Sequence, residues 1–315
     1  MQPSDLDLHR NPLGRGGTPP GFRLDRAGVR RSFERASAGY DGAAVLQARV
    51  RTELLDRLRW IAIEPARVLD LGCGTGEGAR QLKRRYPRAL TLALDIAPGM
   101  LREARRRSRP FRRFERVCGD AYRLPLADAS TDLVFGNLLL QWCDSPDEVL
   151  AEIRRVLRPG GFLAFSTLGP DTLQELRGAW AAADDASHVN SFLDMHDVGD
   201  ALTRADFAEP VLDVERFTLS YADVLGLTRD LKAIGAHNVT TGRSRGLTGR
   251  GKWRAMTEAY ESFRSDGRLP ATYEVIYGAA WSREASAGSG RGQIGSPVHG
   301  EVRVSPAAIR RRPRS

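Results

Sequence analysis

Five short segments with apolar residues at most positions are predicted to be strands: residues 67–71, 90–95, 114–118, 131–135 and 162–166. Three stretches with the apolar periodicity of helices lie between them: residues 77–86, 98–107 and 146–157. Strands that alternate with helices predict a doubly wound, Rossmann-like α/β sheet whose strands are mostly parallel. Ligands of such sheets bind beyond the carboxyl ends of the strands, so the residues there are the candidates for function.

The pattern changes on both sides of this core. Before it, apolar positions at helical spacing predict a helical lead-in over residues 29–59. After it, Arg158-Pro159-Gly160-Gly161 predicts a sharp turn. The remaining predicted elements are helices at residues 172–183 and 222–234 and strands at residues 209–218 and 273–281. The last strand completes a seven-stranded sheet, and we interpret the segments around 170–205 and 222–270 as a cap over the ligand-binding edge.

Composition favours one large domain with loose ends. The chain has 315 residues, 41% of them hydrophobic, which is enough for a substantial core. Residues 1–28 and 283–315 are rich in Gly, Pro or Ser and are predicted to be disordered tails around a domain at 29–282. No apolar run is long enough for a membrane span or a signal peptide, and the three scattered cysteines favour neither disulfides nor a metal site, so we predict a cytoplasmic protein.

The net charge of +9 is unevenly distributed. The C-terminal tail has seven arginines and two glutamates but no aromatic or base-reading partners for them, so we predict no nucleic-acid partner. Residues 232–254 hold six basic residues and no acid. Such a patch indicates an anionic partner or substrate group, although a solvated loop has the same charge pattern.

The first predicted strand runs directly into Gly72, Gly74 and Gly76, where a glycine turn lets the backbone approach a ligand closely. Asp95 ends the second strand 19 residues after Gly76, the position of an acid that accepts hydrogen bonds from ribose hydroxyls. Glu77 stands where a dinucleotide fingerprint requires its third glycine. The loop is therefore expected to bind a nucleoside-containing ligand other than a nicotinamide dinucleotide.

The pattern from Asp70 to Gly76, Asp-x-Gly-x-Gly-x-Gly, resembles motif I of the class I S-adenosylmethionine-dependent methyltransferases. The resemblance implies that Asp70 orients the loop and that the glycines admit the amino-acid end of S-adenosylmethionine. A purely structural strand-to-helix turn would share the glycines, but not the acids at the later strand ends.

Other candidates for cofactor binding lie at neighbouring strand ends or on the lead-in: Ile96, Met100, Asp120, Ala121, Asn137 and Gln47. Asp120 is placed to accept a hydrogen bond from the amine of an adenine, with Ala121 against its ring and Met100 against its other face. The alternatives are a turn-forming or helix-capping role for Asp120 and a core position for Met100.

Several separate segments closely resemble the malonyl-acyl-carrier-protein O-methyltransferases of biotin synthesis: residues 33–40, 46–47, 136–143, 165–168, 231–236 and 242–243. The resemblance covers residues 29–281 and departs at Gly136, where the family usually has serine. It implies methyl transfer from S-adenosylmethionine to the free carboxylate of malonyl carried on acyl carrier protein or coenzyme A. The ester then enters synthesis of the pimeloyl precursor of biotin.

A malonyl carboxylate is ionised at neutral pH, so its attack on the methyl group needs no catalytic acid or base. A cation is expected to orient it; Arg243 is the first candidate and Lys232 the second, with a structural ion pair as the alternative for Lys232. Tyr40 and Gln47 are expected to close the site against water, and packing is the alternative for Tyr40.

Rival functions remain open from the sequence. A different class I methyltransferase, such as a quinone-ring C-methyltransferase, would share the cofactor residues but would need a pocket base. A cofactor-binding scaffold without activity would keep the glycines and lose the cap residues. We predict a monomer with no membrane partner.

Overall fold

The computed structural model describes residues 24–108, 113–186, 188–236 and 249–284. Most of both predicted tails, and Arg243, therefore lie outside the described residues. The predicted N-terminal tail extends too far, because residues 26–28 begin a helix. The reason is local: the Asp25 side chain caps that helix by accepting a hydrogen bond from the Gly28 N–H at 2.8 Å.

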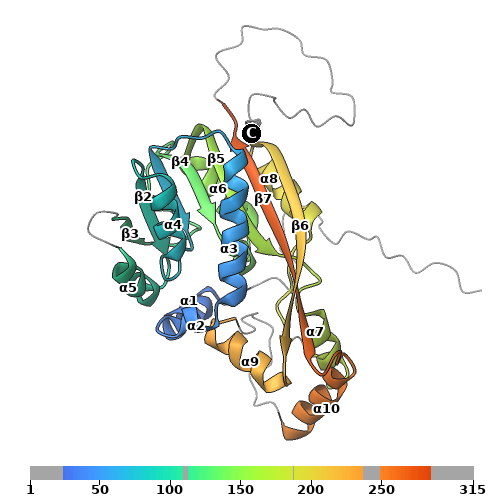
Figure 1. The fold of residues 1–315 in the computed structure, drawn as a ribbon. Helices are drawn as coiled ribbons and strands as arrows, with labels where there is room; N and C mark the ends of the chain where they lie inside the picture. The colour runs from blue at the N-terminus through green and yellow to red at the C-terminus, as the bar shows by residue number, and fades with distance from the viewer. Residues whose placement is uncertain (1–23, 109–112, 187, 237–248, 285–315) are drawn as a thin grey trace, which may run out of the picture.

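The sheet has seven strands in the order β3-β2-β1-β4-β5-β7-β6. Their bounds are Arg67–Leu71 (β1), Leu90–Asp95 (β2), Glu115–Cys118 (β3), Thr131–Gly136 (β4), Leu157–Leu168 (β5), Phe207–Tyr221 (β6) and Leu269–Ser282 (β7). The neighbouring pairs from β3 to β5 are parallel, and β7 runs antiparallel to both β5 and β6 (Figure 1). The prediction of a doubly wound, mostly parallel seven-stranded sheet is confirmed.

The helices of the core also agree with the sequence to within one residue at each end. The helices are Arg26–Ala36 (α1), Tyr40–Ala43 (α2), Val45–Arg57 (α3), Glu77–Arg85 (α4), Pro98–Arg107 (α5), Pro146–Val156 (α6), Gln174–Ala181 (α7), Met195–Arg204 (α8), Val224–Ala233 (α9) and Arg250–Glu261 (α10). The predicted continuous lead-in helix is wrong, because it is divided into α1, α2 and α3. Gly39 precedes α2 and Ala44 leaves the helical region before α3, and glycine is a poor helix former.

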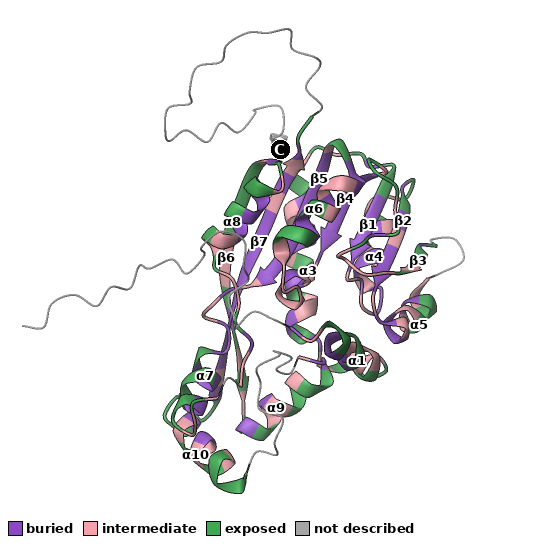
Figure 2. Cartoon of the chain, turned by 180° about the vertical axis from the view of Figure 1, so that it is seen from behind, coloured by how far each residue is buried: buried purple, intermediate pink, exposed green. Residues whose placement is uncertain are grey.

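Helices pack against both faces of the sheet, and strands β1, β2, β4, β5 and β7 are mostly buried, whereas the edge strands β3 and β6 are mostly exposed or half-buried (Figure 2). Successive side chains of a strand point to opposite faces. Accordingly, Leu133 and Phe135 of β4 join one buried cluster with α3, whereas Val134 joins a second cluster with α6 and α8. This two-sided core holds the carboxyl ends of the parallel strands in fixed positions.

Strands β6 and β7 form a long antiparallel pair that extends past the rest of the sheet. Pairing of β5 with β7 stops at Leu168 and Val275, but β6 and β7 stay paired as far as Tyr221 and Leu269. Helices α7, α9 and α10 gather around the far end of this strand pair (Figure 1). These helices form the lobe that faces the ligand-binding edge.

One prediction is wrong in this region. Helix α8, inside the predicted cap segment 170–205, packs instead against α6 and β6 on the sheet, because Val198, Ala201 and Leu202 form a buried apolar stripe. The turn predicted at 158–161 is a bulge within the bounds of β5: Leu157 pairs with Thr131 and Phe162 with Leu133, and Gly160 has a positive φ of 71°. Among the described residues, no helix is both long and apolar enough to cross a membrane.

Candidate active site

The glycine turn after β1 combines three left-handed residues, with φ of 70° at Gly72, 53° at Gly74 and 80° at Gly76. Glycine adopts such angles without steric cost. A Cβ atom at Gly74 would meet no atom within 4 Å, whereas a Cβ at Gly76 would lie 2.7 Å from the Cβ of Ala104. Gly74 therefore leaves open space for a ligand, and Gly76 makes room for helix α5.

Asp95 ties the end of β2 to this turn. One carboxylate oxygen accepts a hydrogen bond from the Gly74 N–H at 2.9 Å, and the other accepts one from the Ala97 N–H at 2.8 Å. Burial raises the pKa of Asp95 to about 6 in spite of these bonds. The side chain is thus fixed in direction and borders the space that Gly74 leaves open.

A cavity of about 830 Å³, the loop cavity, lies between this turn and the lead-in. Nine predicted site residues line it: Tyr40, Gly72, Gly74, Asp95, Ile96, Met100, Asp120, Ala121 and Asn137. The structure thus brings together residues from four strand ends. Gly76 does not line the loop cavity, because α5 occupies the space beside it, and Asp70 and Gln47 border adjoining cavities instead.

Sequence reasoning missed the residues that close the loop cavity from the outside. The Arg26 guanidinium lies 3.4 Å from the centre of the Tyr122 ring and pairs with Asp144 at 3.1 Å. Phe33 packs edge-on against Trp142, with 5.0 Å between ring centroids. These contacts join segments about a hundred residues apart, so no local pattern marks Arg26 or Tyr122. The lead-in resemblance did include Phe33, and the family-like loop included Trp142.

Two carboxylates of the lead-in fasten it over the loop cavity. Glu34 accepts hydrogen bonds from the Gly99 N–H at 2.6 Å and from Arg102 at 2.5 Å. Asp41 of α2 accepts one from the Thr75 hydroxyl at 2.7 Å and pairs with Arg107. The lead-in is therefore bound to α5 and to the glycine turn.

A second cavity of about 710 Å³, the polar cavity, shares Tyr40, Gly72, Gly74 and Asn137 with the loop cavity. Four buried polar atoms at its border have no hydrogen-bond partner among the described residues: Gln47 Oε1, Arg51 Nε, Asp70 Oδ2 and Arg107 Nε. Burial raises the pKa of Asp70 to about 7 and lowers that of Arg51. Unsatisfied buried groups of both charges fit a ligand part that carries both an ammonium and a carboxylate group.

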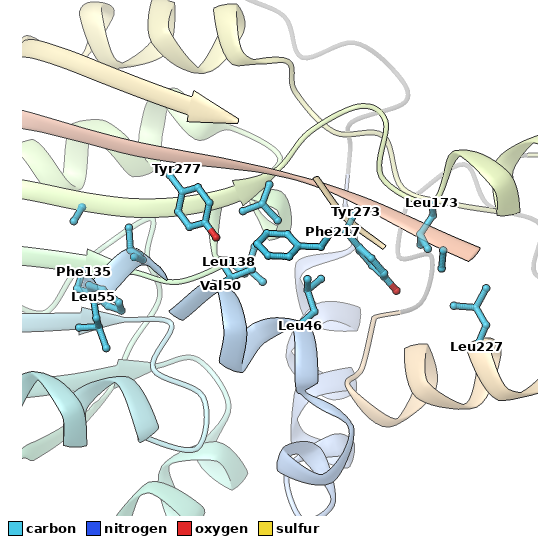
Figure 3. Packing of buried hydrophobic residues seen from close by; sticks show 14 of the residues in the cluster. Leu46, Val50, Leu55, Phe135, Leu138, Leu173, Phe217, Leu227, Tyr273 and Tyr277 are labelled. Atoms are coloured by element: carbon cyan, nitrogen blue, oxygen red, sulfur yellow. The ribbon is translucent and has the colours of Figure 1, made fainter. Parts of the chain in front are cut away.

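A third cavity of about 1090 Å³, the apolar cavity, lies between the lead-in and the lobe of α7 and α9. It meets the loop cavity at a junction formed by four residues that line both: Phe33, Tyr40, Leu138 and Trp142. Figure 3 shows how Leu46 of α3, Leu173 before α7 and Tyr273 of β7 bring apolar side chains toward this region.

Two of the three predicted substrate-orienting residues, Lys232 and Tyr40, line cavities of the structure. Among the described residues that line the apolar cavity, Lys232 is the one lysine or arginine. Tyr40 lines all three cavities, and burial together with the charges of Asp95 and Asp41 raises its pKa, so its hydroxyl stays protonated. Arg243 lies outside the described residues, and its role stays a prediction.

The basic segment 232–254 is only partly available to a partner. Lys252 pairs with Asp184 at 3.0 Å, and Arg254 pairs with Glu258 at 2.7 Å. Hydrogen bonds from Lys252 and then His188 lower the pKa of Asp184 to about 2. Two of the six basic residues of segment 232–254, Lys252 and Arg254, therefore form ion pairs within the lobe.

Known proteins are similar to this chain over most of its length. The family model of a methyltransferase domain matches residues 69–165. The malonyl-[acyl-carrier protein] O-methyltransferase of Laribacter hongkongensis is 56% identical over 82% of this chain and 90% of that protein. The enzyme of the same name from Halorhodospira halophila is 48% identical over 92% and 97%. The crystal structure of the YcgJ protein from Bacillus subtilis matches with a TM-score of 0.54 at 15% identity, covering 76% of this chain and all of that one, which supports the fold alone.

Proposed function

The chain belongs to the malonyl-[acyl-carrier protein] O-methyltransferase family, and on that premise we propose that it methylates the free carboxylate of a malonyl thioester with S-adenosylmethionine. The observation that carries the proposal is the junction of Phe33, Tyr40, Leu138 and Trp142, where the loop cavity meets a separate apolar cavity. A methyl group can pass there from one ligand to the other. The relatives do not favour the alternative of a quinone-ring C-methyltransferase.

The described residues fit S-adenosylmethionine, which supplies an electrophilic methyl group when bound. Asp95 is suited to the ribose hydroxyls, and the open side of Gly74 admits close approach of the ligand. The unpaired atoms of Gln47, Arg51 and Asp70 match the charged groups at the amino-acid end. These assignments deepen the prediction made from the strand ends, which did not include Arg51.

The chain has to position its substrates rather than move a proton. A malonyl carboxylate is already a nucleophile at neutral pH, so no base is required. Correct orientation of two bound reactants can contribute about 7–11 kcal/mol to catalysis. The lead-in, fastened by Glu34 and Asp41, excludes water from the junction and so keeps the carboxylate poorly solvated.

Lys232 attracts the carboxylate into the apolar cavity. A cation stabilises the charged reactant more than the transition state, in which that charge is being lost, so its contribution to binding exceeds its contribution to rate. Replacing Lys232 with Met is expected to raise the KM for malonyl-coenzyme A about tenfold, a loss of about 1.4 kcal/mol, with kcat changed less than threefold. Steady-state kinetics measure both constants. Arg229→Met, which removes an exposed cation of the same helix α9 outside the cavity lining, is the matched control, and an equal KM for both variants would contradict the assignment.

Detection of the methyl ester tests the proposed function. Purified protein is incubated with S-adenosylmethionine and malonyl-acyl carrier protein, and the product is weighed by mass spectrometry. We expect a gain of one methylene on the malonyl form and none on the acetyl form, which lacks a free carboxylate. Failure to form the ester while S-adenosylhomocysteine still binds would reject the substrate and leave the methyltransferase fold standing.

Comparing kcat/KM for malonyl-acyl carrier protein and malonyl-coenzyme A decides which carrier the chain prefers. The monomeric state stays a prediction that light scattering after size-exclusion chromatography can test. The cytoplasmic location also stays a prediction.

A further inference from the structure

Trp142 lines both the loop cavity and the apolar cavity, and its indole carries a hydrogen-bond donor. Trp142 ends a short 3-10 turn, Leu140–Trp142, and its own backbone N–H donates to the Leu139 carbonyl at 2.9 Å. Phe33 packs against the ring nearly at right angles, which holds it in place. The indole N–H can only donate, and no acceptor for it is present in the part of the chain that the structure describes.

The neighbouring amide of Gln141 is held in a defined orientation. The Thr167 hydroxyl of β5 donates to Gln141 Oε1 at 3.3 Å. Because Oε1 is used as the acceptor, the amide NH₂ of Gln141 is left as a donor, and within residues 24–284 as far as they are described it has no acceptor. Gln141 lines the apolar cavity next to Trp142. One neutral donor, Trp142, therefore lies at the junction, and a second, Gln141, lies next to it on the wall of the apolar cavity.

The cation Lys232 does not lie at the junction of the two cavities. Lys232 lines the apolar cavity but not the loop cavity, whereas Trp142 lines both. This division suits a reaction in which a carboxylate loses its charge. A cation close to the reacting oxygen would hold back the reactant, whereas a neutral donor keeps a hydrogen bond to the carbonyl oxygen of the ester.

We propose that Trp142 and Gln141 bind the malonyl carboxylate through one oxygen and leave its second oxygen free to attack the methyl carbon. This inference rests on the proposed function. A carbon–oxygen bond forms to the methyl carbon as the carbon–sulfur bond of the sulfonium breaks, and the electron pair of that bond returns to sulfur. The products are the methyl ester and neutral S-adenosylhomocysteine, and no proton moves. Thr167 acts as a positioning residue because it fixes which end of the Gln141 amide faces the cavity.

Binding without turnover separates this role from general damage to the enzyme. Malonyl-coenzyme A is titrated by calorimetry into protein saturated with S-adenosylhomocysteine, and steady-state kinetics are measured in parallel. Trp142→Phe and Gln141→Leu are each expected to raise the Kd of malonyl-coenzyme A and to lower kcat/KM about tenfold, with the Kd of S-adenosylhomocysteine unchanged within twofold. Trp281→Phe, a substitution of a tryptophan that packs on Phe162, is the matched control and should behave as wild type.

The Thr167→Val substitution tests whether Thr167 acts through Gln141 or only contributes to the stability of the fold. It should raise the KM about fivefold in the wild-type background and have no further effect in Gln141→Leu, because the hydroxyl acts only through that amide. The inference is overturned if Trp142→Phe and Gln141→Leu both retain wild-type affinity, or if the Thr167 effect persists without Gln141. Wild-type protein that binds S-adenosylhomocysteine but forms no malonyl ester would instead reject the proposed function.

Discussion

Replacing Asp95 with alanine is expected to raise the Kd of S-adenosylhomocysteine about 100-fold or more. In the proposed complex the carboxylate accepts hydrogen bonds from two ribose hydroxyls, and it already holds the Gly74 N–H at 2.9 Å. Hydrogen bonds to a charged group contribute about 1.5–3 kcal/mol each, so losing two costs about 3 kcal/mol or more. Isothermal titration calorimetry measures the change. Asp213→Ala, which removes an exposed partner of Arg57, is the control, and an Asp95→Ala affinity within threefold of wild type would refute the assignment.

The pH dependence of binding checks the same residue. Burial raises the pKa of Asp95 to about 6 in the free protein, so the carboxyl group becomes protonated as the pH falls through that value. Because the hydroxyls bind better to the ionised form, the contribution of Asp95 to wild-type affinity should be lost as the pH falls through about 6. Burial also raises the pKa of Asp70 to about 7, so the comparison is with Asp95→Asn, which should lack only the Asp95 part of the slope.

The variants Gly76→Ala and Gly74→Ala are expected to have opposite effects. At Gly76 the new Cβ would lie 2.7 Å from the Cβ and 3.0 Å from the Cα of Ala104, and φ is already 80°. Backbone strain of about 1–2 kcal/mol and overpacking of about 1–3 kcal/mol should together lower the free energy of unfolding by about 2–5 kcal/mol. At Gly74 the methyl group would meet open space, so only the strain of about 1–2 kcal/mol applies to stability.

For cofactor binding, we expect Gly74→Ala to have the larger effect and Gly76→Ala the smaller one. The added methyl at Gly74 projects into the space that the cofactor is proposed to fill, so we expect the Kd of S-adenosylhomocysteine to rise roughly tenfold or more, about 1.4 kcal/mol. Folded Gly76→Ala should bind with less loss, because its methyl group faces α5. Urea denaturation and calorimetry on both proteins measure the two quantities. If Gly76→Ala were the weaker binder and Gly74→Ala the less stable protein, the assigned roles would be wrong.

The strand bounds that the sequence predicted correctly depend on the residues of the strand itself and its immediate neighbours. Strands β1 and β2 have their predicted bounds because each is a mostly apolar segment between polar or glycine-rich segments. The local pattern of Pro159 and two glycines predicted the bulge at 158–161, but not that β5 begins before it. Leu157 belongs to β5 because it pairs with Thr131 of β4. That pairing partner lies in another part of the chain and leaves no mark on the local pattern.

The sequence by itself determined the alternating fold, the glycine turn and the acids at the strand ends, because parallel strands in one sheet bring their carboxyl ends to one edge. Only the tertiary structure decided what surrounds that edge. It placed Arg26 on Tyr122, left Gln47, Arg51 and Asp70 with unpaired atoms at one cavity, and separated Lys232 from the junction at Trp142. It also showed that the two glycines differ: Gly74 faces open space, whereas Gly76 lies against Ala104 of helix α5. These outcomes depend on contacts between residues far apart in the chain, which the spacing of residues along the sequence does not encode.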